Sequence, residues 1–195
     1  RSHKAWSLGV MTSTRGGGHL GGSPQTENRR VSPEVGQRLF KNPQAGVPES
    51  YTGKGRLVAW TERNKAIVDS LGLCYFMYGW YDLTIGPIEE LAELFTLATG
   101  IEASGESLHQ QGLRIHTLER YLTCRLGGYS RADDMLPDRF FEMPVSSGPY
   151  QGAHLDREQV ELMLDEYYTA LGWDVETGVP SQEQLAALGL SFLNA

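Results

Sequence analysis

Signals that start and stop α-helices recur from Leu57 to the end of the chain, and they constrain the fold more than any other feature of the sequence. Ser104, Asp156 and Ser181 each precede an amphipathic segment, where a short polar side chain can accept a hydrogen bond from the first helical turn. Gly72 follows such a segment, as glycine often does when a helix ends. No run alternates between apolar and polar residues as a half-buried strand does. The chain is therefore predicted to be mainly α-helical.

The apolar stripes and the punctuation between them give approximate bounds for the individual helices. Helices are expected from Ser32-Pro33 to Phe40, from Leu57 to a stop at Gly72, from Gly86-Pro87 to a stop at Gly100, from about Ser104 to Leu126, from the cap at Asp156 through Leu171, and from the cap at Ser181 to Gly189.

The first third of the chain is rich in glycine and is expected to consist mostly of loops. Residues 1–30 are predicted to be loop-rich, and the stretch from Thr12 to Gly22 is crowded with glycines, which permit tight turns and close approach of the backbone to a ligand. Proline, glycine and asparagine between Lys41 and Gly55 indicate a second loop. We therefore expect residues 1–195 to form one irregular multi-helix domain with a glycine-rich N-terminal loop region.

The composition argues against several classes of protein. The chain carries 17 basic and 24 acidic residues, a net charge of -7, which argues against a nucleic acid as its main partner. No apolar run approaches the roughly 20 residues needed to span a bilayer, so no membrane partner is expected. Two cysteines cannot build a disulfide scaffold, so we expect a cytoplasmic location. The chain starts at Arg1 without a methionine, and we interpret it as a fragment.

The first candidate site lies at the end of the helix that Gly72 stops. Asp69 falls in the last turn, where a carboxylate opposes the negative end of the helix dipole and invites a functional explanation. Cys74 follows the turn, and a lone cysteine in such a place is most often a small buried apolar residue. The alternative is a thiolate ligand of a metal or an iron–sulfur cluster. The only other cysteine is Cys124, expected inside a helix, so further ligands of a cluster must come from elsewhere.

The second candidate is His19, which lies in the glycine-rich stretch four residues after Arg15. A loop histidine of this kind is often simply exposed to solvent. Its functional interpretation is a proton-transfer group, because histidine titrates near neutral pH and a glycine-rich loop can bring it close to a substrate. The other histidines have no matching partners in the sequence and are predicted to be structural: His3, His109, His116 and His154.

Four segments, in this order and at this spacing, carry a resemblance to a known family. They read AWSLGVMTSTRGGGHL, DSLGLCYF, LRIHTLERYLTCRLGGYSRADDMLPDRF and DEYYTALGWDVETGVPSQEQLAALGL. From about Ala5 to Leu190 the chain resembles the C-terminal domain of the tungsten-containing aldehyde ferredoxin oxidoreductases. The resemblance implies a tungsten, or a molybdenum, held by the dithiolene sulfurs of two pterins beside a [4Fe–4S] cluster. It also implies oxidation of aldehydes to carboxylic acids, with ferredoxin as electron acceptor.

The same resemblance implies roles for individual residues. Cys74 matches the fourth cysteine ligand of the cluster, and Asp69 matches a carboxylate that hydrogen-bonds a pterin. The backbone of Gly72 and Leu73 matches a stretch that lies against the same cofactor. His19 matches a histidine assigned to proton transfer near the metal.

The chain lacks the other three cluster cysteines, the β-rich base domain and the middle domain of that family. It is therefore expected to be inactive alone and to need the remaining domains of the enzyme, a ferredoxin and a small aldehyde as partners. Two alternatives stay open. One is a relative that acts on another substrate, such as an aromatic thioester, and the other is a cofactor-free helical interaction module.

Overall fold

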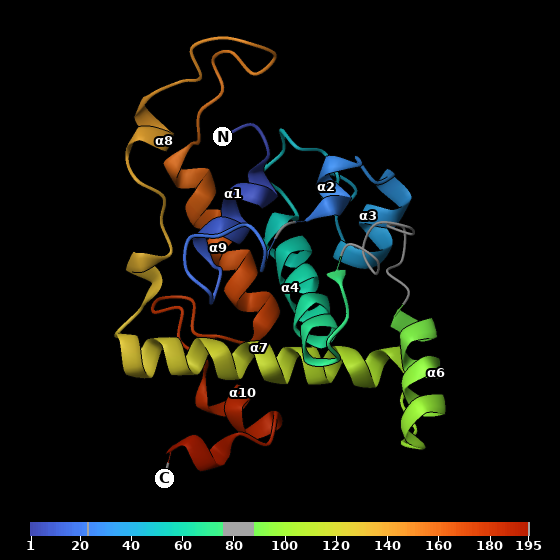
Figure 1. Ribbon diagram of the computed structural model, residues 1–195. Helices are drawn as coiled ribbons and strands as arrows, with labels where there is room; N and C mark the ends of the chain where they lie inside the picture. Colours follow the sequence, from blue (N-terminus) through green and yellow to red (C-terminus); the bar gives the residue numbers. More distant parts are fainter. Residues whose placement is uncertain (23, 76–87, 195) are drawn as a thin grey trace.

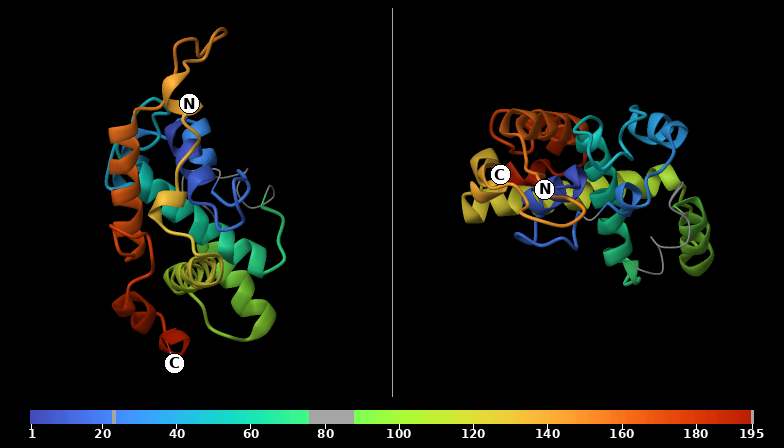
Figure 2. Two further views of the ribbon diagram at one scale, coloured as in Figure 1. Left: turned by 90° about the vertical axis from the view of Figure 1, so that its left-hand side faces the viewer. Right: turned by 90° about the horizontal axis from the view of Figure 1, so that it is seen from above.

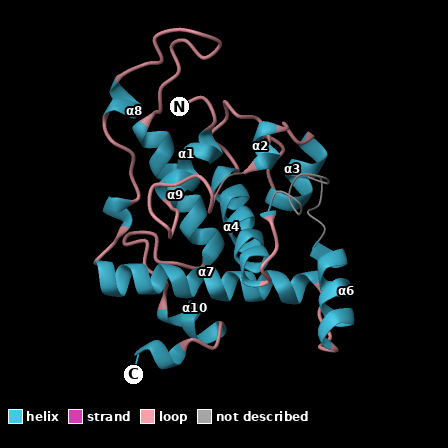
Figure 3. Cartoon of the chain, viewed as in Figure 1, coloured by secondary structure: helices cyan, strands magenta, loops and turns pink. Residues whose placement is uncertain are grey.

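The computed structural model describes residues 1–22, 24–75 and 88–194, and these residues fold into helices joined by loops (Figures 1 and 3). Within these ranges, the β-structure amounts to one isolated bridge between Trp173 and Pro180. The predicted mainly α-helical fold is confirmed. Gly86 and Pro87, which were expected to open a helix, lie outside the described residues.

A central helix, α4, contacts the helices on three sides of it: α1, α7 and α9. Figure 1 shows α4 and α9 side by side, with the long α7 running across their lower ends, and the left view of Figure 2 looks nearly along α7. In chain order the helical elements are α1 (Lys4–Met11), α2 (Gln25–Asn28), α3 (Pro33–Phe40), α4 (Lys54–Ser70), α6 (Ile88–Thr99), α7 (Gly105–Gly127), η1 (Arg131–Asp133), α8 (Arg139–Glu142), α9 (Arg157–Leu171), α10 (Gln182–Ala187) and η2 (Ser191–Asn194).

The helix predicted to start at Leu57 begins three residues earlier, at Lys54, but four other predicted helix starts are confirmed by their caps. At each one a short side chain accepts a hydrogen bond from an N–H group that the helix itself leaves unpaired. The side-chain oxygens of Ser32, Ser104, Asp156 and Ser181 accept from the backbone N–H groups of Val35, Ser107, Gln159 and Gln184, respectively.

Residues 1–30 are loop-rich, as predicted, but they also contain two short helices that the sequence did not indicate, α1 and α2. The N–H groups of Ala5 and Trp6, at the start of α1, donate to the carboxylate of Glu27 at 2.9 and 3.2 Å. Glu27 in turn forms a fully buried ion pair with Lys54, at 2.8 Å. The cap of α1 therefore comes from a distant residue, and no local sequence signal marks it.

Two glycines let α4 pack closely against both of its larger neighbours. A Cβ added to Gly55 would lie 2.4 Å from the backbone nitrogen of Tyr167 in α9. A Cβ added to Gly112, in α7, would lie 2.3 Å from the carbonyl oxygen of Arg63 in α4. Contacts this short exclude any side chain at either position. The close packing brings polar residues of α4, α7 and α9 into one cluster.

Candidate functional site

The last turn of α4 ends as the sequence predicts. Gly72 has a φ of +70°, and its N–H donates to the carbonyl of Asp69 at 3.1 Å. The N–H of Leu73 donates to the carbonyl of Val68 at 3.0 Å, which completes a Schellman motif. A Cβ added at Gly72 would meet nothing within 4 Å, so the left-handed φ alone explains the glycine. Leu73 and Cys74, immediately after the turn, are exposed.

Asp69 has partners within the chain that offset its unfavourable place in the helix dipole. The Nζ of Lys65, one turn earlier, donates to its Oδ1 at 2.5 Å, and the Nη1 of Arg15 lies 3.9 Å from its Oδ2. Two cations near the carboxylate counter the negative end of the helix. The Asp69 side chain stays 43% exposed, so its second oxygen is accessible to another donor.

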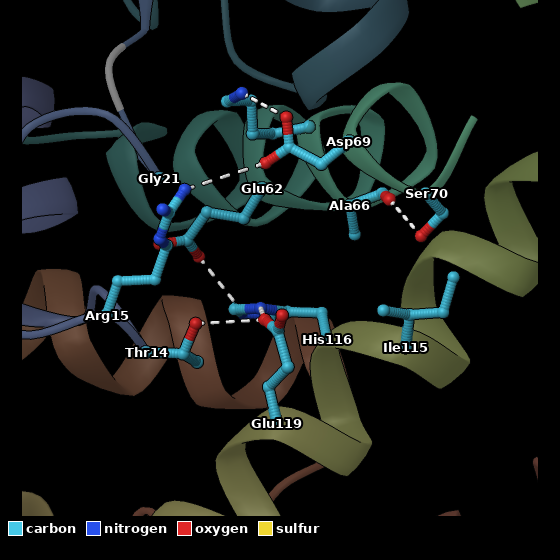
Figure 4. Close-up of a pocket in the computed structure, with 11 residues that line it drawn as sticks. Thr14, Arg15, Gly21, Glu62, Ala66, Asp69, Ser70, Ile115, His116 and Glu119 are labelled. Atoms are coloured by element: carbon cyan, nitrogen blue, oxygen red, sulfur yellow. Dashed lines mark hydrogen bonds and ion pairs between the residues drawn. The ribbon is translucent and has the colours of Figure 1, made fainter. Parts of the chain in front are cut away.

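A cavity of about 240 Å³ lies between α4, α7 and the glycine-rich loop, with Asp69 on its wall (Figure 4). The structure thus brings Asp69 together with part of the glycine-rich loop. Gly72, Leu73, Cys74 and His19 are not among its lining residues. The lining residues are Thr14, Arg15, Gly21, Glu62, Lys65, Ala66, Asp69, Ser70, Ile115, His116 and Glu119.

The inner wall of the cavity is a buried ionic cluster. The Nε2 of His116 lies 3.2 Å from Glu62 and 2.9 Å from the hydroxyl of Tyr167, and its Nδ1 lies 3.8 Å from Glu119. Glu62 also accepts hydrogen bonds from Tyr167 at 2.5 Å and from Thr12 at 3.2 Å. Burial opposes a charge on His116, but the carboxylates of Glu62 and Glu119 outweigh it and raise the pKa of His116 to about 9. The imidazole is therefore protonated at neutral pH.

The sequence interpretation missed this cluster. His116 was predicted to be structural because the sequence showed no matching partners; in the structure its partners come from α4 and α9 and from its own helix. The available signal was weak. Glu62 and Asp69 are seven residues apart in α4, and His116 and Glu119 are three apart in α7, so each pair shares a helix face. Only the packing of α4 on α7 turns the two faces toward each other.

Comparison with known proteins places this geometry in a family. The family model described as "Aldehyde ferredoxin oxidoreductase, domains 2 & 3" matches residues 1–190. The chain belongs to the aldehyde ferredoxin oxidoreductase family. The tungsten-containing aldehyde ferredoxin oxidoreductase of Pyrococcus furiosus is 30% identical over 192 residues, which are 98% of this chain and 29% of the relative. The enzyme of the same name from Pyrococcus horikoshii is 29% identical over 191 residues, 97% of this chain and 28% of the relative.

Proteins named for other activities also match. The "Aliphatic sulfonate oxidoreductase, WOR-like subunit" of Pyrococcus furiosus is 35% identical over 153 residues, 75% of this chain and 22% of the relative. Among solved structures, the BamBC active-site complex of benzoyl coenzyme A reductase matches with a TM-score of 0.56 at 24% identity. That match covers 74% of this chain and 20% of the other, and it shows a shared fold. The chain thus spans less than a third of the length of these relatives.

The two cysteines and His19 lie in different surroundings. Cys74 is an exposed free thiol, whereas Cys124 is partly covered and burial raises the pKa of its thiol. His19 is exposed and stacks on Trp6, with ring centroids 5.8 Å apart. The described residues contain no group of three or more histidine, cysteine or acidic side chains able to hold a metal. The Cys74 thiol is accessible at the surface of the chain.

A membrane-spanning role finds no support in the helices that the structure describes, since none of them is long and apolar enough to cross a bilayer.

Proposed function

We propose that this chain is the C-terminal part of a tungsten (or molybdenum) bis-pterin oxidoreductase that oxidises aldehydes to carboxylic acids and passes the electrons to ferredoxin. The observation that carries the proposal is the turn after α4, where a single bend exposes the carboxylate of Asp69 and the thiol of Cys74. Membership of the aldehyde ferredoxin oxidoreductase family supports the same assignment.

Each residue of the turn has a distinct task in this proposal. Asp69 accepts hydrogen bonds from pterin N–H groups through the oxygen that Lys65 does not hold. The open space around Gly72 lets the backbone of Gly72 and Leu73 approach the same ring system. Cys74 supplies one thiolate to a [4Fe–4S] cluster, and the remaining ligands come from the other domains.

His19 is the proposed proton acceptor, since oxidation of an aldehyde with water releases protons and an imidazole can take one up near neutral pH. When bound, the metal–pterin group and the cluster supply the two-electron oxidation and the route by which the electrons leave. Residues 1–195 act as a single helical domain that needs the remaining domains of the enzyme, so the chain alone is inactive.

A second candidate function is oxidation or reduction of a substrate other than a simple aldehyde. The observation in its favour is the 35% identity to the aliphatic sulfonate oxidoreductase subunit, against 30% to the aldehyde enzyme of the same organism. Turnover of the complete enzyme with small aldehydes, aliphatic sulfonates and an aromatic thioester separates the two candidates.

The test of the proposed function compares two cysteine variants in the complete enzyme. Cys74→Ala is expected to degrade the [4Fe–4S] centre, because the iron that loses its thiolate is left to water or an improvised ligand. Cys124→Ala is the matched control and is expected to leave the cluster intact. The measurements are iron content and the electron paramagnetic resonance signal of the reduced enzyme. Equal loss in both variants, or no loss from Cys74→Ala, contradicts the proposal and favours a cofactor-free interaction module.

A further inference from the structure

The glycine-rich loop between α1 and α2 is held at its ends by backbone contacts. At one end Thr12 is the C-cap of α1 and donates its N–H to the carbonyl of Leu8 at 3.0 Å. Near the other end Gly22 packs directly on Gly9, since a Cβ added to Gly9 would lie 2.3 Å from the carbonyl oxygen of Gly22. In the middle of the loop His19 stacks on Trp6 of α1, with ring centroids 5.8 Å apart, and the stretch before it is held by side-chain contacts. Ordering so many glycines is costly, because glycine loses more conformational entropy than any other residue.

Three side chains of the loop meet carboxylates on α4 and α7. The hydroxyl of Thr12 donates to Glu62 at 3.2 Å, and the hydroxyl of Thr14 donates to Glu119 at 2.9 Å. The guanidinium of Arg15 lies 3.9 Å from Asp69. All three acceptors line the same cavity, as Figure 4 shows for Thr14, Arg15, Glu62, Asp69 and Glu119.

His116 holds two of these three carboxylates in place. It lies between Glu62 and Glu119 and is fixed by its contact with Tyr167 and by stacking on Trp173, with ring centroids 5.3 Å apart. One imidazolium between two carboxylates leaves a net negative charge facing the loop, which favours the hydroxyl donors and Arg15. Lys65 and Asp69 are the other charged groups on the cavity wall.

We propose that Thr14 and Glu119 are positioning residues: their hydrogen bond latches the glycine-rich loop onto α7 and holds His19 in a fixed relation to the turn that carries Asp69 and Cys74. The Thr12–Glu62 contact and His116 support the same latch. The inference rests on the proposed function in so far as His19 serves the reaction. The latch itself is supported by the contacts of Thr12, Thr14 and Arg15 with carboxylates on α4 and α7.

The test replaces one hydroxyl in the complete enzyme. Thr14→Val keeps the shape of the side chain and removes the donor to Glu119, and Thr14→Ser keeps the donor. Thr123→Val is the matched control, because the hydroxyl of Thr123 bonds only to the carbonyl of Glu119 within α7, at 2.9 Å. Two quantities are measured: hydrogen exchange of the backbone amides of residues 13–22, and kcat and KM for a small aldehyde at constant iron and tungsten content.

Thr14→Val is expected to speed exchange in the loop and to lower kcat by about tenfold, with a smaller change in KM, since a hydrogen bond to a charged group is lost. Thr14→Ser and Thr123→Val are expected to match the unmodified enzyme in both measurements. Unchanged exchange in Thr14→Val overturns the latch, and faster exchange with unchanged kcat overturns its positioning role. If the unmodified enzyme oxidises no aldehyde, the proposed function fails, while the exchange comparison still decides the latch.

Discussion

Two carboxylates on α4, Glu62 and Asp69, lie two turns apart on the wall of one cavity, yet their surroundings are opposite. Glu62 is 3% exposed and is held by His116, Tyr167 and Thr12. The side chain of Asp69 is 43% exposed and faces two cations, the exposed Arg15 and the mostly covered Lys65. A buried carboxylate is stable only when it is fully paired, whereas an exposed one can exchange its partners for a ligand at little cost. The inner end of the cavity is therefore held by buried pairing, whereas the outer end presents a carboxylate that is accessible to solvent.

The largest expected effect follows removal of the buried carboxylate. Glu62→Ala removes the closest acidic partner of His116 and the acceptor of Tyr167, and breaking a buried pair in this way costs about 3–5 kcal/mol of unfolding free energy. Denaturant unfolding of the chain measures the loss. Glu106→Ala, an exposed change on α7, serves as control and is expected to stay within about 0.5 kcal/mol. Equal losses of unfolding free energy in the two variants contradict a stabilising role for the buried pairing of Glu62.

The pH dependence of stability tests whether His116 is charged in the folded protein. The pKa of His116 is raised to about 9 in the folded protein from the ordinary value of 6.5, so the stabilisation is complete below pH 6.5 and is lost as pH rises through 9. The two values correspond to about 3 kcal/mol. The difference in unfolding free energy between the unmodified chain and His116→Gln should therefore shrink from pH 6 to pH 9.5. A difference that is constant over this range contradicts a charged His116.

Asn64 tests the cost of burying a polar group that lacks a hydrogen-bond partner. It lies on the same helix and is 1% exposed, but neither atom of its amide has a hydrogen-bond partner within the described part of the chain. A buried polar group without a partner costs about 1–3 kcal/mol, so Asn64→Leu, which has a similar shape, is expected to raise the unfolding free energy by about 1 kcal/mol. Denaturant unfolding measures the gain. A loss of stability instead would reveal a partner for Asn64.

The smallest effect is expected at the outer carboxylate. Asp69→Asn removes an exposed ion pair with Lys65, which is worth about 0.5–1 kcal/mol at most, and also relieves the unfavourable interaction with the helix dipole. The unfolding free energy of the chain should therefore hardly change, while pterin content of the complete enzyme falls. Thermal or denaturant unfolding and cofactor analysis of the same variant check both halves. A loss comparable to that of Glu62→Ala would remove the distinction between the two ends of the cavity.

Features that depend on interactions within one helical turn could be predicted from the sequence alone. The caps at Ser32, Ser104, Asp156 and Ser181 and the left-handed stop at Gly72 act within one helical turn, so their residues could be identified without any knowledge of the fold. The family resemblance was visible for the same reason, because its motifs are contiguous stretches of sequence. The turn between Asp69 and Cys74 was predicted in this way, but the favoured prediction of a buried Cys74 is wrong, because the structure exposes its thiol.

Only the tertiary structure decided the features whose partners are distant in sequence. The start of α1 is capped by Glu27, 22 residues beyond Ala5, and the cluster around His116 joins Glu62 to Tyr167 across 105 residues. No pattern of neighbouring residues encodes such contacts, since they arise when α4 packs closely on α7 and α9 at Gly55 and Gly112. Helix periodicity can assign His116 to a face of α7. Which charges meet that face depends on the packing, and burial among those charges is what keeps the imidazole protonated.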